Sequence, residues 1–137
     1  SEEDKDMETK ERYSFEELKE IIATLRSEHG CPWDRQQTYE SLKKCFVDET
    51  QEVFEAVDNH DMENLCEELG DVLLLVMLNS QIAKENGAFT IEDVIDGLCR
   101  KMIRRHPHVF GDAKADSPEE SLALWNAIKA QEKAERP

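Results

Sequence analysis

Two pairs of acidic side chains occupy positions of the sequence where a buried helix face would need apolar residues. Stepping by three or four from Leu42, the inward stripe reaches Glu49 and Glu52, and a second stripe further along reaches Glu68 and Asp71. Carboxylates at i and i+3 lie on one helix face, about 5–6 Å apart. Two such pairs on adjacent antiparallel helices would bring four negative charges to one place. Because hard oxygen ligands in that number suit Mg²⁺ or Mn²⁺, the pattern predicts a site for a divalent cation.

Periodicity alone leaves a second interpretation of these carboxylates open. If the phase of the stripe is shifted by one residue, the same side chains form ordinary solvated helix faces. A di-iron bundle is a competing metal site, but it uses Glu-x-x-His pairs. Here Glu49 is followed three residues later by Glu52, and Glu68 by Asp71. No histidine is placed to serve as a ligand, which disfavours iron.

A basic cluster near residue 100 is the second unusual feature of this acidic chain. Lys101, Arg104 and Arg105 stand at i, i+3 and i+4, so they share one helix face. Complementing the negative end of a helix dipole explains one or two of them. Three together indicate an anion site, since a guanidinium offers a two-donor fork to phosphate. Trp33 and Trp125 could stack on a base, although a tryptophan on an apolar stripe is more often part of the core.

The elements that position these residues are all predicted to be helices. Ser14 with Glu17 forms a capping-box pattern, Asn86-Gly87 is a helix-ending signal, and Ser117-Pro118 is a helix start. The run of residues 72–78 is apolar all round, as expected for a central buried helix. The predicted helices cover residues 14–30, 38–59, 62–85, 90–105 and the chain from 117 onward, with loops at 31–34 and 107–117. Short connections make the predicted fold an all-α antiparallel bundle of about five helices.

Composition bounds the class of protein. The chain has 137 residues and a formal charge of −15, which argues against binding to nucleic acid polymers or an anionic membrane. No run approaches the roughly 20 apolar residues of a spanning helix. Residues 1–13 are predicted to be an acidic flexible tail without the apolar segment of a signal peptide. Residues 14–137 are predicted to form a single helical domain in the cytoplasm.

Several motifs in the same order resemble the MazG nucleotide pyrophosphohydrolases. The block Asp48-Glu49-Thr50-Gln51-Glu52, fifteen residues, then Glu68-Leu69-Gly70-Asp71 is similar to the ExxE…ExxD signature of this family. Gly30-Cys31-Pro32-Trp33-Asp34 precedes it, and Arg104-Arg105-His106-Pro107-His108-Val109-Phe110-Gly111-Asp112 follows it. The resemblance covers roughly residues 14–134. It departs from the family at Asp48, where a glutamate is usual, and it includes one copy of a domain that some relatives carry twice.

The resemblance implies an all-α enzyme of the nucleoside triphosphate pyrophosphatase type, with a role in nucleotide-pool housecleaning. It would hydrolyse a nucleoside triphosphate to the monophosphate and pyrophosphate, with Mg²⁺ as cofactor and Mn²⁺ as a substitute. The implied metal ligands are Glu49, Glu52, Glu68 and Asp71, with Glu49 or Glu52 taking the proton of the attacking water. The implied substrate-binding residues are Lys101, Arg104, Arg105 and Trp125. The family also implies a homodimer or a larger homo-oligomer.

Two other functions remain open at this point. One is a related all-α hydrolase for dUTP or phosphoribosyl-ATP, although the Pro-Trp-Asp and Arg-Arg-His-Pro segments favour MazG. The other is a non-catalytic helical module that binds a nucleotide or a protein, its carboxylates serving only as a solvated face.

Overall fold

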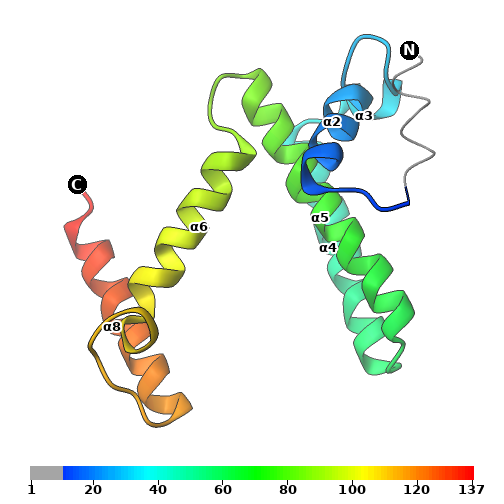
Figure 1. Cartoon of the computed structure of the whole chain (residues 1–137). Helices are drawn as coiled ribbons and strands as arrows, with labels where there is room; N and C mark the ends of the chain where they lie inside the picture. Colours follow the sequence, from blue (N-terminus) through cyan, green and yellow to red (C-terminus); the bar gives the residue numbers. More distant parts are fainter. Residues whose placement is uncertain (1–10) are drawn as a thin grey trace. The chain divides into compact units, whose positions relative to one another are not determined.

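The computed structural model describes residues 11–137, and every regular element in this range is a helix (Figure 1). The all-α class is therefore confirmed. The helices are α2 (Phe15–Leu25), α3 (Pro32–Gln36), α4 (Tyr39–Asp58), α5 (Met62–Glu85), α6 (Ile91–Arg105), α7 (Pro107–Phe110) and α8 (Pro118–Glu135). The five longer ones correspond to the five predicted helices. Most of the predicted flexible tail, residues 1–10, lies outside the described residues.

Local capping interactions explain where the long helices begin. The Ser14 backbone N–H donates to Glu17 Oε1 at 3.0 Å, and the Glu17 N–H donates to Ser14 Oγ at 3.2 Å. This is the predicted capping box of α2. Thr38 caps α4 in the same way, with Ser41 as its partner. Ser117 caps α8 with a proline at the first helical position, as predicted.

Three local predictions are wrong. Helix α2 ends at Leu25 and not near Gly30. The chain leaves the helix early because it turns back on the end of α2, where the Cys31 N–H donates to the Leu25 carbonyl at 2.8 Å. Two predicted loops each contain a short helix, α3 and α7, which begin at Pro32 and Pro107. Proline is favoured in the first turn of a helix, where its missing N–H leaves no bond unmade.

The described residues belong to two compact units, and the boundary between them along the chain falls between residues 90 and 91. The prediction of one domain over 14–137 stays a prediction. In the first unit, α4 and α5 form an antiparallel hairpin, whose turn places His60 at φ 53°. Helix α2 packs against α5. The core residues are Ile22, Leu42, Ala56, Leu75, Met77, Leu78, Ile82 and Ala83. The prediction that residues 72–78 are buried all round is wrong for Leu73, which is exposed in the single chain.

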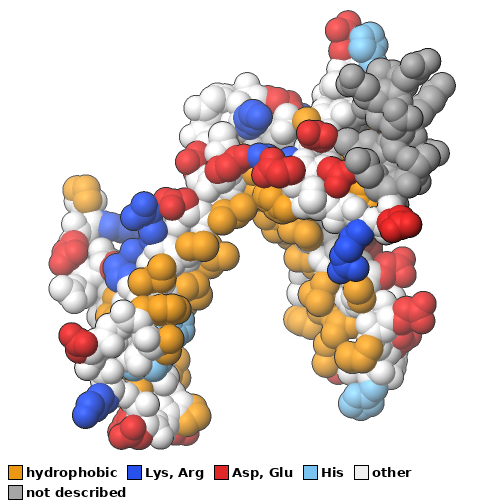
Figure 2. Space-filling view, viewed as in Figure 1, with side chains coloured by type: hydrophobic (Ala, Val, Ile, Leu, Met, Phe, Trp, Pro, Cys, Tyr) orange, Lys and Arg blue, Asp and Glu red, His pale blue; other side chains and the backbone are white. Residues whose placement is uncertain are grey.

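The second unit consists of α6, α7 and α8. None of its described residues is buried, although α6 has a clear apolar stripe. Figure 2 shows hydrophobic side chains gathered along the surface of each unit. The exposed apolar residues of the second unit are Val94, Ile95, Leu98, Ile103, Val109, Phe110 and Leu122. In the single chain the second unit therefore exposes large apolar side chains whose burial would normally stabilise a helical unit.

No helix within residues 11–137 combines the length and apolar character that crossing a membrane would require.

Candidate metal centre

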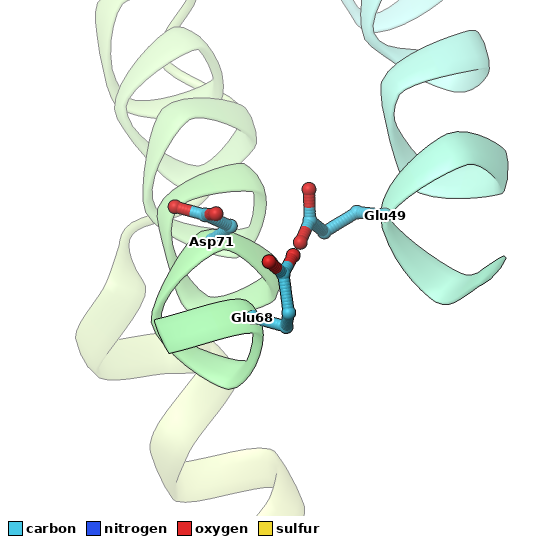
Figure 3. A group of neighbouring side chains, drawn as sticks. All are labelled: Glu49, Glu68 and Asp71. Atoms are coloured by element: carbon cyan, nitrogen blue, oxygen red, sulfur yellow. The ribbon is translucent and has the colours of Figure 1, made fainter. Parts of the chain in front are cut away.

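Three of the four predicted carboxylates meet in the α4–α5 hairpin. Glu49 of α4 points toward Glu68 of α5, and Asp71 lies one turn further along the same helix (Figure 3). One carboxylate oxygen from each of the three lies within 4.8 Å of the others. The local cause is simple: i and i+3 put Glu68 and Asp71 on one face of α5, and the hairpin turns Glu49 toward that face.

The carboxylates differ in burial. Glu68 is 8% exposed, which is rare for a glutamate, and Glu49 is half-buried. Glu49 therefore shares the packed side of α4 with the buried Leu42 and Ala56. Glu52 is exposed, yet its carboxyl interacts with that of Glu68. All four predicted residues are thus neighbours, with Glu52 at the solvent side of the group.

The group has no positive partner among the residues that the structure describes. None of the four carboxylates takes part in a salt bridge there. The nearby Lys44 pairs with Asp48 at 2.7 Å instead. Two buried oxygens, Oε1 of Glu49 and Oε2 of Glu68, have no hydrogen-bond partner. An uncompensated buried carboxylate costs several kcal/mol, so either a shared proton or a cation from outside must offset this charge.

Mutual repulsion changes the proton affinity of the group. A hydrogen bond with Glu68 and the negative charge of that residue raise the pKa of Glu52 above its usual 4.5. A hydrogen bond with Glu49 raises the pKa of Glu68, and a hydrogen bond with Glu52 opposes that rise. Desolvation and the charges of Glu49 and Asp71 raise it further. Two carboxyl groups can hydrogen-bond to each other only by sharing a proton, and a divalent cation would take that proton's place. Clustered hard oxygens with unpaired buried atoms therefore fit Mg²⁺ or Mn²⁺.

The predicted substrate-binding residues lie in the second unit. Arg104 and Arg105 both pair with Glu132 of α8, and the guanidinium carbon of Arg105 lies 4.9 Å from the ring centroid of Trp125. Lys101 is half-buried on the preceding turn of α6. The structure thus brings Arg104, Arg105 and Trp125 together. This basic cluster and the carboxylate group belong to different units, and each is described by itself.

Sequence reasoning missed Glu132, which contacts both arginines. A signal for it exists: Trp125, Ile128 and Glu132 are spaced i, i+3 and i+7, so Glu132 shares a face of α8 with the tryptophan. A charged residue at an apolar position of a stripe is the same kind of signal that revealed Glu49 and Glu68. The many other acidic residues of this chain obscure this signal at Glu132.

A second network missed from the sequence holds the segment from Gly30 to Gln37. Arg26, whose side chain is almost wholly buried, donates to the backbone carbonyls of Asp34 and Gln37 and pairs with Glu85 at 2.9 Å. The buried amide of Gln37 donates to the Trp33 carbonyl at 2.9 Å. The backbone of the Pro-Trp-Asp motif is therefore fixed between α2 and α5, while the Trp33 side chain remains exposed.

Fold and site together define an all-α protein whose helical hairpin carries a carboxylate group suited to a divalent cation. The sequence identifies the family. Residues 37–110 match the MazG nucleotide pyrophosphohydrolase domain, and the chain belongs to this family, as the sequence motifs predict.

Two relatives show how far the sequence likeness extends. The chain is 56% identical over 122 residues to the nucleoside triphosphate pyrophosphohydrolase/pyrophosphatase MazG of Thermotoga maritima, covering 89% of this chain and 46% of that protein. It is 40% identical over 123 residues to the nucleoside triphosphate pyrophosphohydrolase of Escherichia coli K12, covering 89% of this chain and 47% of that one. The chain thus spans about half the length of these two relatives.

The likeness extends to a solved structure. The crystal structure of a mazG-related protein from Thermotoga maritima superposes with a TM-score of 0.68 at 35% identity, covering 84% of this chain and 98% of that one. The helical fold is therefore shared over most of both chains.

Proposed function

We propose that this chain hydrolyses nucleoside triphosphates to the nucleoside monophosphate and pyrophosphate, and that it depends on Mg²⁺, for which Mn²⁺ can substitute. One observation carries the proposal: a member of the MazG domain family buries a carboxylate group that has no counter-charge among the described residues. The two relatives described above are named for this activity. The proposed ligands are Glu49, Glu52, Glu68 and Asp71.

The chemistry divides between the cation and the carboxylates. A bound Mg²⁺ would neutralise phosphate oxygens and make a water molecule more acidic. Glu68 and Asp71, on one face of α5, would hold the cation together with Glu49. Glu49 or Glu52 would accept the proton of the attacking water. Glu52 suits this role because it lies at the solvent side of the group and its pKa is raised, which makes it a stronger base.

The residues of the second unit would bind the substrate. Lys101, Arg104 and Arg105 supply positive charge for the triphosphate in a chain whose formal charge is −15. They would also stabilise the negative charge that develops on the departing pyrophosphate. Trp125 has an indole ring already packed by Arg105 and by His106, whose ring centroid is 5.4 Å away. Its remaining surface would contact the nucleoside.

The same proposal includes self-association. The second unit has no buried residue, and the first exposes Val47, Phe54, Val57, Leu69 and Leu73 on its hairpin. A second copy of the chain would cover such surfaces in a homodimer or a larger homo-oligomer. Light scattering coupled to size exclusion tests this directly, since a monomer of the full chain at micromolar concentration would contradict it. We further propose a cytoplasmic role in nucleotide-pool housecleaning.

The central experiment measures pyrophosphate release from a panel of common, deoxy and modified nucleoside triphosphates, with and without Mg²⁺. Metal-dependent release of one pyrophosphate per monophosphate is expected from wild type, and none from Glu49→Gln with an unchanged circular dichroism spectrum. Hydrolysis confined to dUTP or phosphoribosyl-ATP would reassign the substrate within all-α hydrolases. No turnover on any substrate, with no thermal stabilisation by Mg²⁺ and nucleotide, would indicate a non-catalytic module.

A further inference from the structure

One carboxylate of the second unit forms ion pairs with two arginines. Glu132 of α8 receives hydrogen bonds from both members of the Arg104–Arg105 pair at the end of α6. The Arg104 Nε donates to Glu132 Oε1. Arg105 donates to Glu132 Oε2, from Nε at 3.1 Å and from Nη2 at 2.8 Å. Each oxygen therefore serves one guanidinium, and the Arg104–Arg105–Glu132 cluster has a net charge of +1.

The two arginines differ in how much surface they leave open. The Arg105 side chain is 14% exposed and lies against Trp125, with its guanidinium carbon 4.9 Å from the ring centroid. The Arg104 side chain is 51% exposed and uses only Nε toward Glu132. Within the described residues its two terminal nitrogens form no hydrogen bond, which leaves them available to a ligand. Arg105 is thus held from two sides, while Arg104 presents its outer edge to solvent.

Helix geometry explains why the two arginines need a residue that fixes their side-chain directions. Consecutive residues of an α-helix project about 100° apart, and two guanidinium groups repel each other. Arg104 and Arg105 would therefore diverge if nothing held them. A carboxylate placed between them overcomes both effects, and Glu132 is 23% exposed, so solvent only partly screens it. The two guanidiniums lower the pKa of Glu132 to about 2, so it stays charged even at acidic pH values that protonate an ordinary glutamate.

We propose that Glu132 is a positioning residue, which fixes Arg104 and Arg105 as a preorganised site for the polyphosphate group of the substrate. The identity of that substrate rests on the proposed function, but the anion site does not. The opposite role for Glu132 would be that of a competing anion, which occupies the arginines until phosphate displaces it. The two roles predict opposite effects when the charge of Glu132 is removed.

The test measures binding of pyrophosphate to the full chain by isothermal titration calorimetry, in EDTA so that no metal contributes. Glu132→Gln removes one negative charge, which by general electrostatics should tighten anion binding. If Glu132 positions the arginines, pyrophosphate affinity instead falls about tenfold, the loss of one charge-assisted hydrogen bond. Glu135→Gln is the matched control, because this exposed glutamate of the same helix pairs with no arginine or lysine among the described residues and accepts a hydrogen bond from Gln131. It should leave the affinity unchanged or slightly higher.

Steady-state kinetics supply the second readout. Glu132→Gln should raise KM for the nucleoside triphosphate about tenfold with a smaller change in kcat, and Glu132→Asp, which keeps the charge, should lie between. A helical circular dichroism spectrum like that of wild type must accompany each variant. Tighter pyrophosphate binding by Glu132→Gln, an effect no larger than that of Glu135→Gln, or no binding by wild type would each overturn the inference. If no triphosphate is hydrolysed, the proposed function fails while calorimetry still decides the role of Glu132.

Discussion

The two charged clusters of this molecule differ in whether a side chain of opposite charge balances them. The acidic group of α4 and α5 buries Glu68 among other carboxylates, with no positive side chain to offset it in the described residues. The basic cluster of α6 and α8 contains its own counter-ion, since Glu132 pairs with Arg104 and Arg105. The first cluster therefore has an unbalanced negative charge, which the proposed cation would offset. The second is already arranged before any ligand arrives.

The two clusters also differ in how much buried packing surrounds them. The acidic group lies in the unit that contains all the buried apolar side chains, so its carboxylates are fixed by a core and tolerate their mutual repulsion. The basic cluster lies in a unit with no buried residue among those described. There the ion pairs themselves position the arginines. Substitutions at the acidic group should thus change the chemistry with the fold intact, and substitutions at the basic cluster should change geometry and binding.

The largest expected effects come from neutralising a carboxylate of the acidic group, as in Glu68→Gln. This change removes the charge at the centre of the acidic group but keeps its shape, so metal-dependent turnover should fall by on the order of a thousandfold, or about 4 kcal/mol. The metal-free protein should be as stable as wild type or more so, because repulsion is relieved. Melting with and without Mg²⁺ checks both statements. Glu67→Gln, one residue away on the exposed side of α5, is the control. A stabilisation by Mg²⁺ that survives Glu68→Gln would contradict this interpretation of the acidic group.

Acidification is the next test of the same group. Because the pKa values of Glu52 and Glu68 are raised above 4.5 in the metal-free protein, protons begin to compete with Mg²⁺ at a higher pH than for ordinary glutamates. Affinity for Mg²⁺ should fall as the pH is lowered toward 5, by up to about tenfold per pH unit for each proton displaced. Calorimetry in two buffers of different ionisation enthalpy measures the proton release. An affinity that is constant between pH 8 and 5 would show that the carboxylates titrate independently.

The sequence predicted what depends on short spacings. The Ser14–Glu17 capping box and the Ser117 cap followed by Pro118 are local patterns, and both begin a helix as predicted. The short helices at Pro32 and Pro107 were missed because proline in a polar segment is equally typical of a loop and of a first helical turn. The early end of α2 was missed because it depends on Gly30 folding back onto carbonyls five and six residues earlier.

In the candidate sites, too, short spacings were predictable from the sequence, whereas contacts set by tertiary packing were not. Spacing on two helices joined by a short turn was enough to predict that Glu49, Glu68 and Asp71 meet, and they do lie together. Their roles as ligands stay predictions. The link from Glu132 to Arg104 and Arg105 spans 28 and 27 residues and two helices. Local spacing places Glu132 on the Trp125 face of α8, but it does not specify that this residue, among 32 acidic ones, pairs with the two arginines. Only the packing of α8 against α6 does.

Alanine substitutions at two glycines, one in each unit, test how tightly the two units are packed. A Cβ at Gly30 would lie 2.1 Å from the Thr24 carbonyl oxygen and 2.4 Å from that of Leu25, both backbone atoms. Gly30→Ala should therefore destabilise the protein by about 1–3 kcal/mol. A Cβ at Gly97, in the interior of α6, would meet nothing within 4 Å, so Gly97→Ala should stabilise by about 0.5–1 kcal/mol. Urea unfolding measures both. A destabilising Gly97→Ala would show that another copy of the chain packs against α6 at this point.

The smallest effect expected is the pH dependence that the Glu132 ion pairs give to folding. The arginines lower the pKa of Glu132 from 4.5 to about 2, so the folded state favours the charged carboxylate. The stabilisation is fully present above pH 4.5 and is lost as the pH falls toward about 2. The difference in melting temperature between wild type and Glu132→Gln should be constant from pH 7 to 5 and shrink below 4.5. A difference unchanged down to pH 2 would mean that Glu132 stabilises the second unit by packing and not by charge, which would remove the contrast between the two clusters.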